Sequence, residues 1–179
     1  MSLYPWYCPS IYFPPLSGNF SLKYQAIQVL HRFNAAEVPK QAFLESDHKT
    51  VADFVPIDAH LSMCPEARAL IEALEPGLHQ FFPVDIIRKR GKKPIHRIDG
   101  RVLDEPYYLF NVQTMLDAVC IERSEVRVVP RTDGRPPTVY PFPANYNIVL
   151  FRSAVDGHHV WHGHHQLSDY LFFSDTLVS

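Results

Sequence analysis

Histidine is the residue type in this sequence that most suggests chemistry. Half of the ten histidines fall within eight consecutive positions: His158, His159, His162, His164 and His165. Imidazole groups on one strand can converge on a metal ion. A strand has a side-chain period of two, however, so His158 and His162 would share one face while His159 shares the other with Trp161. No carboxylate or cysteine completes the set nearby, so we expect structural or surface histidines, no bound metal and no cofactor.

Two catalytic alternatives remain, one for the histidines and one for the cysteines. A small metal-dependent hydrolase could use the histidine cluster with Asp156 or Asp169. One of the cysteines, Cys8, Cys64 and Cys120, could act as a nucleophile. The three cysteines are widely spaced and form no C-x-x-C pair, which indicates neither a disulfide framework nor a thiolate metal site. Reduced thiols are therefore expected.

Motifs that mark the common classes of enzyme do not occur. The seven glycines are scattered singly, which leaves no phosphate-binding or dinucleotide-binding loop. Neither G-x-S-x-G nor H-E-x-x-H is found. The sequence therefore favours a protein that binds another molecule over an enzyme.

The overall charge argues against nucleic acid, and the prolines argue against a membrane span. Charged residues make up 20% of the chain and the formal net charge is −2, far from the basic balance that nucleic-acid binding usually requires. The first 22 residues carry no charge, but Pro5, Pro9, Pro14 and Pro15 would break a spanning helix. No basic residue precedes this stretch as it would in a secretion signal. A cytoplasmic protein is expected.

Two stretches depart from this near-neutral balance. Residues 1–87 hold five basic and nine acidic side chains, which is compatible with an acidic face towards a basic partner. Residues 88–101 hold seven basic side chains and one acidic one, together with Gly91 and Gly100. This is the composition of a solvated hairpin loop, and a role in binding an anion or nucleic acid is the alternative.

The apolar pattern predicts one α+β domain over residues 1–179. Hydrophobic residues make up 46% of the chain, enough for one sizeable core, and the 16 prolines fall mostly between apolar segments. We expect a loop- and proline-rich fold with a mostly antiparallel sheet packed against a few helices. Strands are predicted at residues 80–87, 107–112, 125–129, 147–151, 158–162 and 170–173.

Two segments have the periodicity of a helix. An apolar stripe runs along residues 62–75 and consists of Ala67, Leu70, Ile71 and Leu74. Ser62 suits the N-cap of this helix, and Pro76-Gly77 suits its end. The stripe should pack against the sheet, so Leu70 is expected to be buried. A second helix is expected at about residues 20–36.

Short elements occur in an order that is similar to a known family. They are V-A-D-F-V-P at residues 51–56, H-L-S-x-x-x-x-A-R-x-L-I-E-x-L-E-P-G at 60–77, H-Q-F-F-P-V at 79–84, Y-Y-L-F-N-V at 107–112, L-D-A-V-C-I-E-R-S at 116–124, D-G-H-H-V-W at 156–161 and F-F-S-D-T-L at 172–177. They resemble the family named immunity protein eleven, over about residues 51–178. Residues 1–50 form a variable N-terminal region outside this resemblance. Family members usually continue into a short C-terminal helix, so a truncated C-terminus is one interpretation of this chain.

The resemblance implies a cytosolic antidote encoded beside a toxin gene in a bacterial polymorphic toxin system. Its partner would be the cognate toxin domain, a nuclease or another intracellular enzyme, with no direct contact to nucleic acid or membrane. A homodimer stays open, and an unrelated protein-interaction module is a further alternative. No catalytic residue carries over. Tight interfaces use exposed aromatic and basic anchors, so the residues predicted to bind the toxin are Arg88, Arg90, Lys92, Arg97, Arg131, Arg135, Tyr140 and Trp161.

Overall fold

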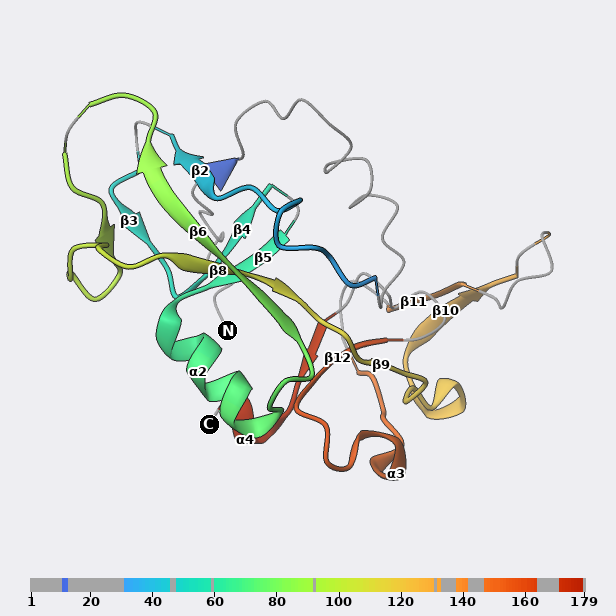
Figure 1. The fold of residues 1–179 in the computed structure, drawn as a ribbon. Coiled ribbons are helices and arrows are strands. Elements are labelled where there is room, and N and C mark those ends of the chain that lie inside the picture. Colours follow the sequence, from blue (N-terminus) through green and yellow to red (C-terminus); the bar gives the residue numbers. More distant parts are fainter. Residues whose placement is uncertain are drawn as a thin grey trace. The chain divides into compact units, whose positions relative to one another are not determined.

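The computed structural model is rich in strands and has few helices (Figure 1). It describes residues 11–12, 31–45, 48–58, 60–91, 93–130, 132, 138–141, 147–163 and 171–178. Most strand pairs are antiparallel, which is consistent with the expected α+β class. Within these ranges, no helix is long and apolar enough to cross a membrane.

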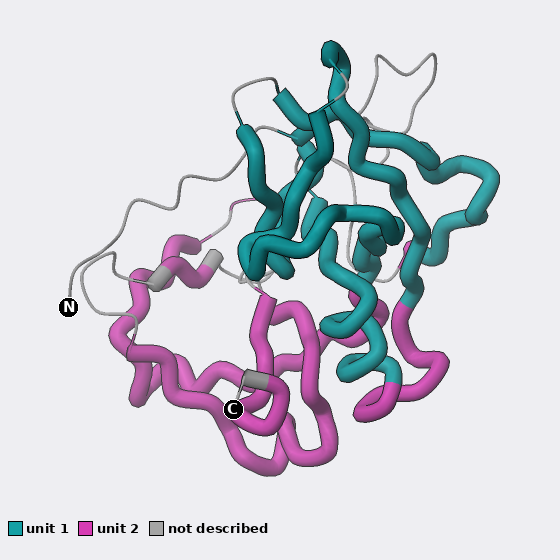
Figure 2. Tube along the Cα trace, turned by 90° about the vertical axis from the view of Figure 1, so that its left-hand side faces the viewer, with its two compact units in different colours: residues 1–27, 32–72, 80–111 teal, residues 28–31, 73–79, 112–179 magenta. Residues whose placement is uncertain are grey.

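The chain forms two compact units, each made of separate stretches of sequence (Figure 2). Unit 1 consists of Met1–Ile27, Arg32–Glu72 and Gln80–Asn111. Unit 2 consists of Gln28–His31, Ala73–His79 and Val112–Ser179. The chain therefore passes between the two units repeatedly. That residues 1–179 behave as one domain stays a prediction.

Unit 1 is built on a six-stranded sheet. The strands follow the order β1 (Ile11–Tyr12), β2 (Gln41–Leu44), β6 (Gln80–Arg88), β8 (Tyr107–Asn111), β5 (His60–Met63) and β4 (Phe54–Ile57). Neighbouring strands are antiparallel except for β2 and β6, which run parallel. A separate parallel pair joins β3 (Thr50–Val51) to β7 (His96–Arg97). The strands predicted at residues 80–87 and 107–112 correspond to β6 and β8.

Alternating burial along β6 places one face of the sheet against the core. Phe82, Val84 and Ile86 are buried, whereas Pro83 and Asp85 are exposed. Pro83 is tolerated because this half of β6 pairs with β8 alone, while the half that starts at Asp85 pairs with β2.

Tyr107 is the largest fully buried side chain of this core. Its hydroxyl donates a hydrogen bond to the carbonyl oxygen of Ala52 at 3.0 Å, which satisfies the one polar group that the ring brings into the core. Burial raises the pKa of the Tyr107 hydroxyl above its usual value, so the group stays a neutral donor.

The helix α2 (Pro65–Leu74) starts three residues later than the sequence predicted. Ser62 is fully buried in β5, where it pairs with Val55 and Leu109, so it belongs to the sheet and is not the N-cap. Cys64 takes that position, because the Ala67 N–H donates to the Cys64 Sγ at 3.5 Å. Pro65 then occupies the first turn, where its missing N–H is harmless.

The face that α2 buries also differs from the prediction. Ile71 is fully buried, whereas Leu70 is 46% exposed. The guanidinium of Arg68 lies over the rings of Phe81 and Tyr108, at 5.7 and 4.4 Å from their centroids. The helix is therefore turned so that residues 67, 68 and 71 face the sheet, which rotates Leu70 towards solvent. The prediction that Leu70 is buried was wrong.

The second predicted helix falls mainly outside the described residues. In its described part, Asn34 begins a turn closed by the Glu37 N–H and the Asn34 carbonyl oxygen at 2.9 Å. The Asn34 side chain accepts a hydrogen bond from the Ala36 N–H at 3.0 Å. Residues 31–36 are thus loop and turn, because this side chain competes with helical hydrogen bonding.

Unit 2 contains shorter elements. A three-stranded sheet has the order β13 (Leu171–Phe173), β12 (Val160–Gly163) and β9 (Met115–Leu116), and a two-stranded ribbon joins β10 (Val126–Val129) to β11 (Thr138–Pro141). The short helices are η1 (Ile121–Arg123), α3 (Arg152–Val155) and α4 (Asp175–Val178).

Three of the strands predicted in unit 2 are present, and one is not. The predictions at residues 125–129, 158–162 and 170–173 correspond to β10, β12 and β13, although β12 starts only at Val160. The strand predicted at 147–151 is reduced to an isolated bridge between Val119 and Leu150, because α3 begins directly after Phe151.

The orientation of α2 yields a stability prediction. We expect Ile71→Ala to lower the free energy of unfolding by about 2–5 kcal/mol, because it removes a fully buried side chain. Leu70→Ala should cost about 1 kcal/mol or less, because much of that side chain is in water. Urea unfolding measures both values, and equal losses in the two variants would contradict the observed helix orientation.

Candidate functional site

The most densely connected polar group of unit 1 surrounds Arg97. The sequence predicted a solvated hairpin loop at residues 88–101, but β7 within it pairs with β3, and Ile95 and Arg97 are buried. Arg97 is only 8% exposed. The prediction was wrong for this part of the loop, because a strand pair and long-range ion pairs hold it in the fold.

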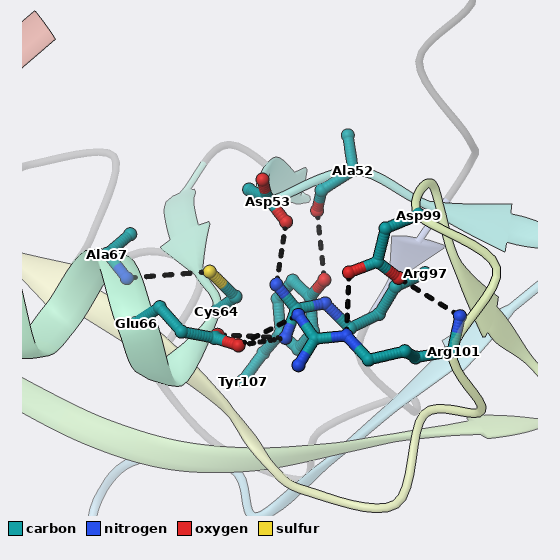
Figure 3. A network of polar contacts seen from close by, with 9 residues as sticks. All are labelled: Ala52, Asp53, Cys64, Glu66, Ala67, Arg97, Asp99, Arg101 and Tyr107. Atoms are coloured by element: carbon teal, nitrogen blue, oxygen red, sulfur yellow. Dashed lines mark hydrogen bonds and ion pairs between the residues drawn. The ribbon is translucent and has the colours of Figure 1, made fainter. Parts of the chain in front are cut away.

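Two acidic residues from other segments hold the Arg97 guanidinium. Its Nη1 donates to the Glu66 Oε1 and Oε2 at 2.7 and 2.8 Å, and its Nη2 donates to the Asp53 Oδ1 at 2.9 Å (Figure 3). Arg101 extends the group, since its Nη2 reaches the Glu66 Oε1 at 2.9 Å and its Nε reaches the Asp99 Oδ2 at 2.7 Å. We call Asp53, Glu66, Arg97, Asp99 and Arg101 the arginine cluster.

The two arginines keep the carboxylates of Glu66 and Asp99 ionised. The hydrogen bond from Arg97 is the main reason why the pKa of Glu66 falls to about 2. The pKa of Asp99 is also lowered, first by the backbone N–H of Arg101 and then by its side chain. In the opposite direction, Glu66 raises the pKa of Arg97. The carboxylates of Glu66 and Asp99 therefore stay negatively charged at neutral pH.

Cys64 lies next to the arginine cluster but is not activated as a nucleophile. The thiol is buried and free. Burial raises its pKa, and the nearby carboxylates of Glu66 and Asp53 raise it further. The thiol is thus protonated at neutral pH, and its evident role is to accept the hydrogen bond at the start of α2.

A cleft of about 410 Å³ opens beside the cluster. One wall is the first turn of α2, with Pro65 and Glu66, and the other is the chain from Arg101 to Glu105, with Arg97 between them. Its lining combines charged side chains with the apolar side chains of Val102 and Leu103. Sequence reasoning found Arg97 but missed Glu66, Asp104 and the cleft itself, because neither wall carries a recognisable local motif.

The structure places the residues predicted to bind a partner in very different surroundings. Arg90 is exposed and Tyr140 is 51% exposed. Arg88 is half-buried and donates to the carbonyl oxygens of Lys93 and His48 at 3.0 and 2.9 Å. Lys92, Arg131 and Arg135 lie outside the described residues.

Trp161 is buried in the core of unit 2. It is 3% exposed, and its ring stacks on Phe172 with 5.7 Å between the centroids. Residues on both faces of β12 are buried, since Val160 is fully covered too. The burial of Trp161 therefore supports a structural role in the core of unit 2.

The histidine cluster is divided among separate contacts. The His159 Nδ1 lies 2.8 Å from the Ser174 hydroxyl, and the His158 Nδ1 lies 3.9 Å from the Glu75 Oε1. A carboxylate from a distant part of the sequence is thus close to the cluster, which the sequence did not indicate. His164 and His165 lie outside the described residues. That the cluster binds no metal stays a prediction.

Glu75 is the buried polar centre of unit 2. Its Oε1 accepts the His159 N–H at 2.9 Å, and its Oε2 accepts the Val160 N–H at 3.2 Å and the His79 Nε2 at 2.7 Å. The His79 Nδ1 accepts the Gln113 N–H at 3.1 Å, so the proton of this ring sits on Nε2. The residues that follow α2 are thereby tied both to the start of β12 and to the segment before β9.

The lowered pKa of Glu66 yields a pH prediction. Its folded-state pKa of about 2 lies below the ordinary value of 4.5, so its contribution to stability is present above about pH 4.5 and disappears as pH falls towards 2. Urea unfolding should show wild type to be more stable than Glu66→Gln at pH 6, with the difference shrinking by pH 3. Glu45→Gln, at an exposed glutamate of unit 1, is the control. A difference that is constant with pH would contradict the ion pair.

Glu75→Gln tests the buried centre of unit 2. A glutamine has one acceptor oxygen, so its amide nitrogen would face an N–H donor of His79, His159 or Val160. We expect a loss of about 1–3 kcal/mol in the free energy of unfolding. Glu125→Gln, at an exposed glutamate, should change it by less than about 0.5 kcal/mol. Equal stability of wild type and Glu75→Gln in urea would contradict this arrangement.

Comparison with known proteins matches nearly the whole chain to one family. The model of the Immunity protein family (Imm11) matches residues 13–179. The match starts well before residue 51, so most of the N-terminal region that the sequence elements left out is part of the family domain. No curated protein matches the chain. Because the family model covers nearly all of it, the chain belongs to the Immunity protein family (Imm11).

Proposed function

We propose that this protein protects the cell that makes it by binding a cognate toxin domain in the cytoplasm. The observation that carries the proposal is the family match over residues 13–179. By the resemblance of its sequence elements, the toxin is a nuclease or another intracellular enzyme of a polymorphic toxin system. The complex contains one toxin domain for each immunity protein, and the toxin is blocked without covalent change.

The state of the reactive side chains supports binding over catalysis. The Cys64 thiol is protonated and accepts a hydrogen bond in the fold. His79 and Glu75 are fully or almost fully covered and bonded to each other and to backbone N–H groups. Arg97 is held by two carboxylates. These groups stabilise the protein and are not arranged to receive a substrate.

Exposed side chains on turns and on the ribbon are the candidates for the toxin interface. Among the members of the predicted set that the structure describes, Arg90 and Tyr140 are exposed. Tyr140 pairs across the ribbon with Arg127, which is exposed as well. Tyrosine and arginine are enriched among residues that dominate binding energy, so Arg90→Ala and Tyr140→Ala belong among the variants to compare in the binding experiment.

Co-expression tests the proposed function directly. Cells that produce the toxin domain encoded by the neighbouring gene should survive when they also produce this protein. Titration calorimetry with the purified domain should give a stoichiometry of one to one, and mass spectrometry should show an unmodified toxin. A toxin domain of a different family is the control and should not be neutralised. Absence of both rescue and binding with the cognate domain would contradict the immunity function.

A further inference from the structure

The turn from Arg97 to Arg101 is a rigid feature at the surface of unit 1. The Arg97 N–H donates to the Arg101 carbonyl oxygen at 2.8 Å, and the Gly100 N–H donates to the Arg97 carbonyl oxygen at 2.9 Å. Gly100 has a φ of 88°, a left-handed conformation that favours glycine. The Asp99 side chain binds both the backbone and the side chain of Arg101. The turn is thus ordered before any partner arrives.

This ordered turn carries the most exposed large apolar side chain of the described chain. Ile98 is 70% exposed, although its own N–H is fixed by the Val51 carbonyl oxygen at 3.0 Å. Val102, at the other end of the turn, is 50% exposed and also lines the cleft. Apolar side chains on a preorganised backbone bind with little loss of conformational entropy. Their placement suits contact with an apolar depression on a partner.

The cleft beside the turn favours a cationic group. Asp104 and Glu105 line it, and neither takes part in an ion pair within the described part of the chain. Together with Glu66 and Asp99 they make four carboxylates against the two guanidinium groups of Arg97 and Arg101, a net charge of −2. The two arginines are already bonded to the carboxylates of their own cluster. The carboxylates of Asp104 and Glu105 therefore remain available to pair with a positively charged group of a partner.

We propose that this surface, the turn with the adjoining cleft, is where the toxin domain binds. Ile98 and Val102 enter an apolar depression of the toxin. A lysine or arginine of the toxin enters the cleft, where its charged end pairs with Asp104 and Glu105 and its aliphatic stem covers Val102. This inference rests on the proposed function and names the partner chemistry, an apolar contact next to a basic side chain.

A second copy of this protein fits the surface less well than a toxin does. In a twofold dimer the same patch meets itself, so two surfaces of net charge −2 would be brought together. Like charges at an interface oppose association. A toxin domain that acts on nucleic acid, in contrast, has a basic surface.

Titration calorimetry with the neighbouring-gene toxin domain tests the apolar part. Ile98→Ala should raise Kd by about 30-fold or more, as expected for an anchor residue. Ile121→Ala makes the same truncation at an exposed isoleucine that does not line the cleft, and its Kd should stay within about threefold of wild type. Ile98→Ala should keep the urea midpoint of wild type, because that side chain is 70% exposed. Ile121→Ala, at a side chain that is 38% exposed, should cost about 1 kcal/mol or less, so both variants should remain folded.

Association kinetics test the charged part. The double variant Asp104→Asn with Glu105→Gln should associate about tenfold more slowly at low salt and should lose much of the salt dependence of the rate. Asp85→Asn, at an exposed acid of the same unit outside the cleft, should behave like wild type.

The outcomes separate this inference from the function on which it rests. If wild type neither rescues cells nor binds the toxin domain, the proposed function itself fails. If wild type binds but Ile98→Ala and the double variant bind equally well, the function stands and this surface is wrong. Loss of binding on Tyr140→Ala alone would assign the contact to the ribbon and overturn the inference. Sedimentation showing a dimer that dissociates on Ile98→Ala would assign the surface to a second copy and overturn it too.

Discussion

The burial of one guanidinium group is the constraint on which the surface of unit 1 depends. Arg97 reaches carboxylates from two other segments, Asp53 before β4 and Glu66 at the start of α2. A side chain that is 9% exposed loses most of its water shell, so its carboxylate partners must stay in place. The Arg97 side chain thereby holds together the start of α2, the start of β4 and the turn that begins at Arg97 itself.

The ion pairs of Arg97 are asymmetric in their exposure, and this adds exposed negative charge to the surface. The side chains of Asp53 and Glu66 are 51% and 52% exposed, whereas that of Arg97 is almost covered. Solvent or a binding partner therefore contacts the carboxylates of Asp53 and Glu66, while the guanidinium of Arg97 is covered. The same asymmetry explains why a segment rich in arginine and lysine has an acidic neighbourhood on its helix side. Counting charges along the sequence gives the opposite impression.

Local patterns were enough to predict the elements whose burial alternates over many residues. Both β6 and β8 were found in this way, as was the end of α2 at Pro76-Gly77, where Gly77 has a φ of 68°. The hairpin of β4 and β5 was missed because Pro56 lies inside β4 and because Ser62 and Met63 of β5 were assigned to the helix that follows. A signal was present, since Val55 and Ile57 alternate with polar or turn residues ahead of Asp58, whose φ is 52°.

Contacts between residues that are far apart in the sequence could not be predicted from these local patterns. The partners of Arg97 lie 31 and 44 residues away, and Glu75 lies 84 residues from His159. Periodicity likewise identified the helix but not its exact rotation, which decided between Leu70 and Ile71. Ile98 could have been noticed, because it is a lone apolar residue among charged ones in R-I-D-G-R. An exposed apolar side chain at such a turn does not contribute to the core, which suggests a role in binding.

The interleaving of the two units has a consequence for how the protein can change during evolution. Neither unit is a continuous stretch of sequence, since residues 73–79 of unit 2 separate two parts of unit 1. A single recombination event between related genes therefore cannot exchange one unit intact. New specificities must arise through substitutions within the existing chain, and exposed positions on turns can accept them without disturbing buried groups such as Arg97 and Glu75.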